Sequence, residues 1–294
     1  MDEIDLVILR KLLYNCRLTY RELAELTDMS VSAIHKRIKK LEDDGTIHTY
    51  IARPSLMALK YINVVIFGMS NAKSMDMISE ELGQHDCIDG VGILGGKRLY
   101  IGVILRDILE LQELSSYVSK VGQITEPTVG ILNYPYSIQP ESLSNTDYKI
   151  LKTLNRDARK PIVDIADDIG LSARTVRRRI DRMIENNLVS FTLEWLPLYE
   201  STFITVFHLY LNEGVDINSR INHLSEIYSQ NMIYIVSFSN IPNLILLSIW
   251  NKTAQDSQRI LGELQTEGFK DVIPHIFYSM KWYDCWLDQL LRSK

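Results

Sequence analysis

Apolar residues near the start of the chain recur at the spacing of one face of a helix. Ile8 and Leu12, with their apolar neighbours, predict a first amphipathic helix over residues 4–13. Thr19 is followed three residues later by Glu22, the spacing of a capping box. This pair predicts the start of a second, short helix.

A third helix is predicted directly afterwards. Ser30 is suited to cap its N-terminus, and Ile34, Ile38 and Leu41 fall on one face. Gly45 is suited to the left-handed position that follows a helix, and strand-like residues come after it. Two short helices joined by a tight turn and followed by a strand predict a winged helix-turn-helix.

The residues that follow alternate between strand-like and helix-like patterns. Their order is β-α-β-β-α-β, the ferredoxin-like arrangement. The predicted ranges are 61–69, 75–84, 88–94, 99–105, 109–121 and 128–132. The same order returns later in the chain, at 203–211, 217–230, 233–238, 245–250, 254–266 and 272–280.

The chain is an internal repeat with an offset of 142 residues. Nine identities occur in this register without a gap, and the second copy again begins with a helix-turn-helix. The pairs are Asp5/Asp147, Ile8/Ile150, Leu9/Leu151, Leu12/Leu154, Arg17/Arg159, Ala24/Ala166, Ser30/Ser172, Arg37/Arg179 and Ile38/Ile180. Twice 142 is nearly the full length of 294 residues, so the chain consists of two copies of one unit.

The predicted fold class is α+β, with two winged helix-turn-helix domains alternating with two ferredoxin-like domains. Pro and Ser residues between the copies predict a linker. The expected segments are winged helix-turn-helix 1 at 1–53, α/β domain 1 at 54–132, a linker at 133–145, winged helix-turn-helix 2 at 146–196, and α/β domain 2 with an apolar C-terminal tail at 197–294.

The overall charge is mildly acidic, at −5, which by itself argues against nucleic acid. The charge is unevenly distributed. Residues 54–143 and 196–294 carry −4 and −3, whereas 1–53 and 144–195 carry 0 and +2. The excess acid therefore lies in the α/β domains.

Both predicted third helices have a basic outer face. The windows 30–40 and 172–182 each carry a net charge of +4. Solvated faces are the ordinary explanation of such charge runs, but the same face recurs on the same helix of a repeated helix-turn-helix. A helix of this kind lies in the major groove of DNA, with arginine and lysine on phosphates and bases. The residues predicted to contact DNA are Ser32, Lys36, Arg37, Lys39, Lys40, Arg174, Thr175, Arg177, Arg178, Arg179 and Arg182.

Other chemistry has weak support in the sequence. His85, Asp86 and Cys87 are adjacent, yet no second pair of ligands follows at the spacing of a zinc site. His208 falls inside a predicted strand, where we expect a packed histidine. Three scattered cysteines suggest no disulfide framework, and no apolar run is long enough to span a membrane. We expect a cytoplasmic protein that is not an enzyme and has no metal, cofactor or catalytic residue.

The first helix-turn-helix resembles that of the Lrp/AsnC, or feast/famine, transcriptional regulators. The matching features are Asp5 with Ile8-Leu9, Arg17, Glu22-Leu23-Ala24, Ser30, Lys36-Arg37-Ile38, Leu41-Glu42, and Gly45 with Ile47. The second copy keeps Asp147, Arg159, Ala166, Gly170-Leu171-Ser172 and Arg178-Arg179, but has Asn187 at the position of the glycine.

The resemblance implies a sequence-specific transcription regulator with recognition helices at 30–43 and 172–185. It also implies a partner in double-stranded DNA, homodimers or higher oligomers formed through the α/β domains, and a small effector bound near the turn between the second and third strands. In copy one this turn is Gly95-Gly96-Lys97-Arg98, which lacks the acidic residue typical after glycine. In copy two the corresponding turn contains Asn and Pro.

One alternative is an enzyme. Siroheme decarboxylases resemble Lrp/AsnC proteins, occur as paired or fused units, and use histidine and arginine of their α/β domains. The basic helices, with Arg177-Arg178-Arg179 in copy two, favour the regulator. A third interpretation, an interaction protein with inert helix-turn-helices, requires that neither DNA nor tetrapyrrole bind.

Overall fold

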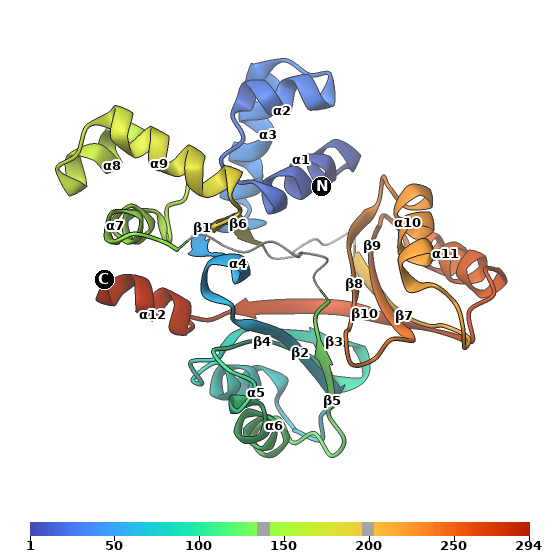
Figure 1. Ribbon diagram of the computed structural model, residues 1–294. Coiled ribbons are helices and arrows are strands. Elements are labelled where there is room, and N and C mark those ends of the chain that lie inside the picture. The colour runs from blue at the N-terminus through green and yellow to red at the C-terminus, as the bar shows by residue number, and fades with distance from the viewer. Residues whose placement is uncertain (134–141, 196–202) are drawn as a thin grey trace. The chain divides into compact units, whose positions relative to one another are not determined.

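The computed structural model describes residues 1–133, 142–195 and 203–294, which form two compact units (Figure 1). One unit contains the described parts of 62–135 and 197–283, and the other those of 2–61, 136–196 and 284–294. The two helix-turn-helix segments therefore belong to one unit and the two α/β segments to the other. Most of the linker predicted at 133–145 lies outside the described residues.

The helix-turn-helix unit contains both predicted three-helix segments. In copy one these are α1 (Glu3–Tyr14), α2 (Tyr20–Thr27) and α3 (Val31–Asp43), followed by β1 (Ile47–Pro54) and the short α4 (Leu56–Leu59). In copy two they are α7 (Asn145–Leu154), α8 (Ile162–Ile169) and α9 (Ala173–Glu185), followed by β6 (Val189–Trp195). The predicted apolar face of α3 is buried, as is the equivalent face of α9.

The helix ends follow the local sequence signals. The Thr19 side chain accepts a hydrogen bond from the Glu22 N–H, and the Thr19 N–H donates to the Glu22 carboxylate, which confirms the capping box. Ser30 caps α3 as predicted. Gly45 follows α3 with φ +76°, and Asn187 takes the matching place after α9 with φ +53°. Asparagine is the side-chain-bearing residue that best tolerates this conformation, which explains how it replaces glycine there.

The two helix-turn-helix segments pair through their wings. Strands β1 and β6 form an antiparallel two-stranded sheet, with Ile51 opposite Thr192 near its middle. Two arginines related by the repeat reach across this pair. Arg17 donates to the Ala158 carbonyl at 2.6 Å, and Arg159 donates to the Cys16 carbonyl at 3.0 Å. The exchange is reciprocal, so each copy helps to hold the other in place.

The C-terminal tail ends in a helix that belongs to the helix-turn-helix unit. The sequence had instead predicted that the tail belongs to the second α/β domain. Helix α12 (Trp286–Ser293) packs on α7 and β1. Its Asp288, which is fully buried, accepts two hydrogen bonds from the Arg53 guanidinium at 2.9 and 2.6 Å. Asn155 also donates to Asp288, at 2.9 Å. The apolar face of the tail and this ion pair together explain its placement.

The α/β unit confirms the β-α-β-β-α-β order in both copies. Copy one has β2 (Ile62–Met69), α5 (Met75–Leu82), β3 (Ile88–Leu94), β4 (Arg98–Leu105), α6 (Glu110–Val121) and β5 (Thr128–Ile131). Copy two has β7 (Phe203–Tyr210), α10 (Ile217–Ile227), β8 (Met232–Ser237), β9 (Leu244–Asn251), α11 (Ala254–Thr266) and β10 (Asp271–Trp282). The short 3₁₀ turn η1 (Gly95–Lys97) joins β3 to β4.

All of these strands form one eight-stranded sheet in the order β5-β2-β4-β3-β10-β7-β9-β8. The two halves join where β3 pairs with β10. The outer strands also meet, because Leu132 forms a bridge with Phe238. Beside this bridge, the Asn240 side chain accepts from the Ile131 N–H and donates to the Val129 carbonyl, each at 2.8 Å. The sheet is therefore curved strongly enough to bring its edges together.

No helix in residues 1–133, 142–195 or 203–294 combines the length and the apolar character needed to cross a lipid bilayer.

Candidate nucleic-acid interface

The outer face of α3 has the predicted basic character. Ser32, Lys36, Lys39 and Lys40 are all exposed. Lys39 forms an ion pair with Asp43 at 2.7 Å within the helix. Lys36 and Lys40 have no hydrogen bond or ion pair with any described residue. Both ammonium groups are therefore available to an external anion.

The outer face of α9 carries guanidinium groups instead. Arg174, Arg177 and Arg178 are exposed, and none of them pairs with a residue in the described part of the chain. Thr175 is half-buried, and its hydroxyl lies 2.9 Å from that of the capping Ser172. Three unpaired arginines thus lie on the first two turns of the helix.

Three arginines predicted to contact DNA have partners inside the protein instead. Arg37 donates to Asp5 at 2.6 Å. Arg179 and Arg182 donate to Asp147 at 3.1 and 2.8 Å. Both aspartates are buried at the starts of α1 and α7, so an unpaired carboxylate would be costly there. These three guanidiniums are therefore internal partners of the aspartates, and their contact with DNA stays a prediction from the sequence.

Electrostatics agree with this pairing. Burial alone would raise the pKa of Asp147, but hydrogen bonds from Ser144 and Arg179, with the nearby charge of Arg182, hold it below its usual range. Hydrogen bonds to Asp2 and Asp5 raise the pKa of Arg37. The sequence carried a signal for this pairing, since Asp5/Asp147 and Arg37/Arg179 are both identities of the repeat. Sequence spacing alone did not connect the aspartate to the arginine 32 residues later.

The turn predicted to bind an effector is ordered by its own contacts. Gly96 and Lys97 adopt positive φ angles of +68° and +61°. The Lys97 ammonium donates to the Ala72 carbonyl at 2.9 Å. Arg98 begins β4, and its Nε is buried without a hydrogen-bond partner among the described residues. In copy two the corresponding turn carries Asn240, which is already engaged with β5.

Arg98 lies close to a buried polar cluster that sequence reasoning missed. The Tyr100 hydroxyl hydrogen-bonds to Nε2 of His208, and the rings of His208 and His275 are 4.5 Å apart. Burial, with the charges of His275 and Arg98, lowers the pKa of His208 to about 3. Burial and Arg98 lower the pKa of His275 to about 4. Both histidines are therefore neutral near pH 7.

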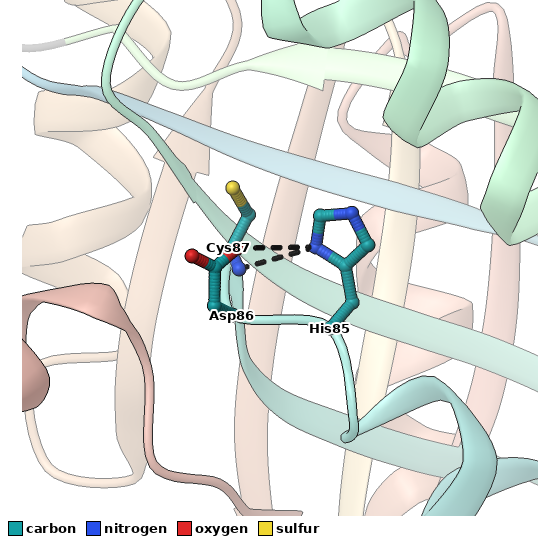
Figure 2. A group of neighbouring side chains, drawn as sticks. All are labelled: His85, Asp86 and Cys87. Carbon is teal, nitrogen blue, oxygen red and sulfur yellow. Dashed lines mark hydrogen bonds and ion pairs between the residues drawn. The ribbon is translucent and has the colours of Figure 1, made fainter.

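Figure 2 shows His85, Asp86 and Cys87, whose potential metal-ligating atoms lie within 4.8 Å of one another. Internal groups already use these atoms. Nδ1 of His85 accepts from the Cys87 N–H at 3.2 Å, and the Arg106 guanidinium binds the Asp86 carboxylate. Burial, with the nearby carboxylates of Glu110 and Asp86, raises the pKa of the Cys87 thiol to about 12. A neutral thiol beside a guanidinium is a poor arrangement for a metal cation.

Two paired helix-turn-helix segments with exposed, unpaired cations on their third helices define a winged helix-turn-helix DNA-binding protein. Residues 1–48 match a family model described as winged helix-turn-helix DNA-binding, and 143–184 match one described as an AsnC-type helix-turn-helix domain. The chain belongs to the Lrp/AsnC family of transcriptional regulators.

The relatives include several archaeal regulators. HTH-type transcriptional regulator LrpA of Pyrococcus horikoshii is 29% identical over 126 residues, which are 42% of this chain and 88% of the relative. An uncharacterized HTH-type transcriptional regulator of Pyrococcus abyssi is 30% identical over 102 residues, covering 30% of this chain and 69% of the relative. Each match thus covers less than half of this chain and more than two thirds of the relative.

Among solved structures, the siroheme decarboxylase NirDL is similar over nearly the whole chain. The TM-score is 0.62 with 9% sequence identity, and the match covers 99% of this chain and 98% of NirDL. At this identity the similarity establishes the fold alone. It shows that the order of two helix-turn-helix and two α/β segments occurs within a single chain elsewhere.

Proposed function

We propose that this Lrp/AsnC-type regulator binds double-stranded DNA sequence-specifically through the outer faces of α3 and α9. The observation that carries the proposal is the presence of exposed, unpaired cations on the same face of both third helices. The proposed contact residues are Ser32, Lys36, Lys39, Lys40, Arg174, Thr175, Arg177 and Arg178.

The physical basis is local charge. Charges interact weakly beyond a Debye length of about 8 Å at physiological salt, so the net −5 of the whole chain does not govern this surface. Residues early in a recognition helix approach base edges, which places Ser32 and Arg174 there. Lysines and arginines further along reach phosphates, and each neutralised phosphate releases counterions.

A salt titration of DNA binding tests the proposal. The double variant Arg174→Ala with Arg178→Ala is compared with wild type by fluorescence anisotropy on genomic target DNA. We expect weaker binding and a log-log salt slope that is smaller by about 0.9 for each lost phosphate contact. Unchanged affinity and slope would contradict the assignment for α9.

Arg259→Ala is the matched control. Arg259 is an exposed arginine on α11 of the α/β unit, and among the described residues its ion-pair partner is Glu263 of the same helix. Its removal lowers the positive charge by the same amount per site while leaving α3 and α9 intact. We expect no change in the salt slope.

Further parts of the proposal rest on the family. Association through the α/β domains into homodimers or larger oligomers, a small effector near Gly95–Arg98, and a cytoplasmic location are all consistent with Lrp/AsnC membership. Arg98 supports the effector site, because its buried Nε lacks a partner in the described structure. Size-exclusion chromatography with light scattering, with and without candidate effectors, tests the assembly.

The second candidate function is a siroheme decarboxylase-like enzyme. One observation favours it. Tyr100 and His208 come from different halves of the sheet and meet beside Arg98 and His275, inside a fold similar to that of NirDL. One NirDL structure contains an iron-uroporphyrin III analogue. Adding such a tetrapyrrole to the purified protein and recording its visible absorbance tests this candidate, and an unchanged spectrum counts against it.

A further inference from the structure

The two recognition helices belong to one compact unit, whose halves are joined through the β1–β6 pair. The β1–β6 ladder runs from the pair Ile47–Trp195 to the pair Pro54–Val189. Arg17 and Arg159 add their reciprocal hydrogen bonds across it. A single chain therefore holds two DNA-reading helices at one fixed separation, without a second chain.

The helices differ at matching positions of the 142-residue repeat, on the first two turns. Where α3 has Ser32, α9 has Arg174, and where α3 has Lys36, α9 has Arg178. The position of His35 is occupied by Arg177 in the second copy. The part of the helix nearest to base edges therefore carries three free guanidiniums in α9, but one ammonium and an imidazole in α3.

The later turns show the opposite distribution. Lys39 and Lys40 of α3 correspond to Asp181 and Arg182 of α9. Arg182 is bound to Asp147, so the last turns of α9 offer little free positive charge. The groove beside α9, of about 910 Å³, is lined by five arginines and two acidic residues, whereas that beside α3, of about 560 Å³, is lined by three lysines and two acidic residues.

These differences have chemical consequences for base recognition. Arginine presents a planar fork that binds O6 and N7 of guanine together, at about 1–3 kcal/mol of discrimination per pair. Lysine is a point charge on a flexible stem and suits phosphate contacts, which carry little sequence information. The structure thus places base-reading groups mainly on α9 and phosphate-binding groups mainly on α3.

We propose that one chain recognises a single, non-palindromic operator made of two unlike half-sites at a fixed spacing. The half-site of α9 contains guanines read by Arg174, the first exposed arginine of the helix. The half-site of α3 is held mainly through phosphates by Lys36 and Lys40 and tolerates sequence change. This inference rests on the proposed DNA-binding function and adds the architecture of its target.

Selection from randomised duplex DNA with the full-length protein tests the inference. We expect a consensus in which one half requires guanines and the other is degenerate. Arg174→Ala should relax the guanine requirement in the first half only, lowering discrimination there by about 5- to 150-fold, the equivalent of one lost bidentate pair. Lys40→Ala should lower affinity evenly across sequences.

A gain of function keeps the test informative if a variant loses affinity generally. Ser32→Arg with His35→Arg transfers the residues of α9 onto two exposed positions of α3. We expect the degenerate half to acquire a guanine preference. Inserting five base pairs between the halves, about half a turn of B-DNA, should remove the contribution of one helix.

The outcomes separate the two proposals. A palindromic consensus with equal halves, or Arg174→Ala acting on both halves, would overturn the inference while leaving DNA binding in place. Tolerance of the five-base-pair insertion would overturn the fixed spacing. Failure to enrich any duplex would overturn the DNA-binding function together with the inference.

Discussion

Replacing Asp147 by asparagine tests whether Arg179 and Arg182 stabilise the fold. The buried carboxylate accepts hydrogen bonds from the N–H and hydroxyl of Ser144 at 2.7 and 2.6 Å. It also accepts from Arg179 at 3.1 Å and from Arg182 at 2.8 Å. Asparagine keeps the shape and one acceptor oxygen, but it removes the charge that faces the two guanidiniums.

The expected loss follows from these contacts. A hydrogen bond to a charged group contributes about 1.5–3 kcal/mol when it is buried. The side chains of Arg179 and Arg182 are 28% and 36% exposed, so solvent screening reduces each bond to about 1 kcal/mol. We expect the free energy of unfolding to fall by about 2 kcal/mol, and the Tm by roughly 8 °C for a unit of this size.

The measurement is thermal and urea denaturation followed by circular dichroism. Asp181→Asn is the matched control, because Asp181 is an exposed acid on α9 and its loss should change stability by less than about 0.5 kcal/mol. A double-mutant cycle between Asp147→Asn and Arg182→Ala should give a coupling of about 1 kcal/mol. Because the pKa of Asp147 is lower in the fold than in the unfolded chain, its contribution to stability is fully present above the unfolded-chain pKa. That contribution is lost as the pH falls through the lower pKa of the folded state.

Two results would refute this reasoning. One is equal stability of Asp147→Asn and Asp181→Asn at neutral pH. The other is an Arg182→Ala variant with unchanged Tm and a DNA-binding salt slope smaller by about 0.9, which would return Arg182 to the DNA-contacting residues.

Three further predictions concern the rest of the chain. His208 and His275 stay neutral in the fold, with pKa values of about 3 and about 4, so protonation of these residues in the unfolded chain lowers stability below pH 6.5. His208→Gln removes one of these protonations. In urea denaturation between pH 6 and 4.5, the free energy of unfolding should therefore fall less steeply with pH than in wild type, by about 1.4 kcal/mol per pH unit. Gly45→Ala should destabilise the fold by about 1 kcal/mol in thermal melts, because φ is +76° at this position. An added Cβ meets no atom within 4 Å, so the backbone conformation alone causes this cost. No change in stability would mean that the turn adjusts freely. Arg17→Ala removes hydrogen bonds to Ala158 and Lys160 and should increase amide hydrogen exchange in β1 and β6, whereas unchanged protection would show that the ladder alone holds the wings.

Much of the fold could be predicted from sequence because its signals are local. The capping box of Thr19 and Glu22, the Ser30 cap and the spacing of Ile34, Ile38 and Leu41 depend on residues within a few turns of one helix. The strand and helix order of both α/β halves follows from apolar periodicity in the same way. The repeat added a long-range signal, since equivalent residues could be compared without any structure.

The separation of basic residues into exposed and internally paired groups needed the tertiary structure. Arg178 and Arg179 are neighbours in sequence, yet the first is exposed and the second reaches Asp147 on another helix. Helical periodicity predicts the side of the helix from which a side chain projects. A long arginine side chain can nevertheless bend from that side toward a buried carboxylate. Its partner depends on how α7 packs on α9.

The sequence by itself determined the repeated unit, its helix-turn-helix, the order of its strands and the location of its positive charge. The tertiary structure decided that like segments associate, that α12 packs beside α7, and that Tyr100 meets His208 from the other half of the sheet. The physical reason is the range of the interactions. Caps and periodic faces act over a few residues, whereas strand pairing and buried ion pairs join groups more than 100 residues apart, whose encounter is set by the packing of the whole unit.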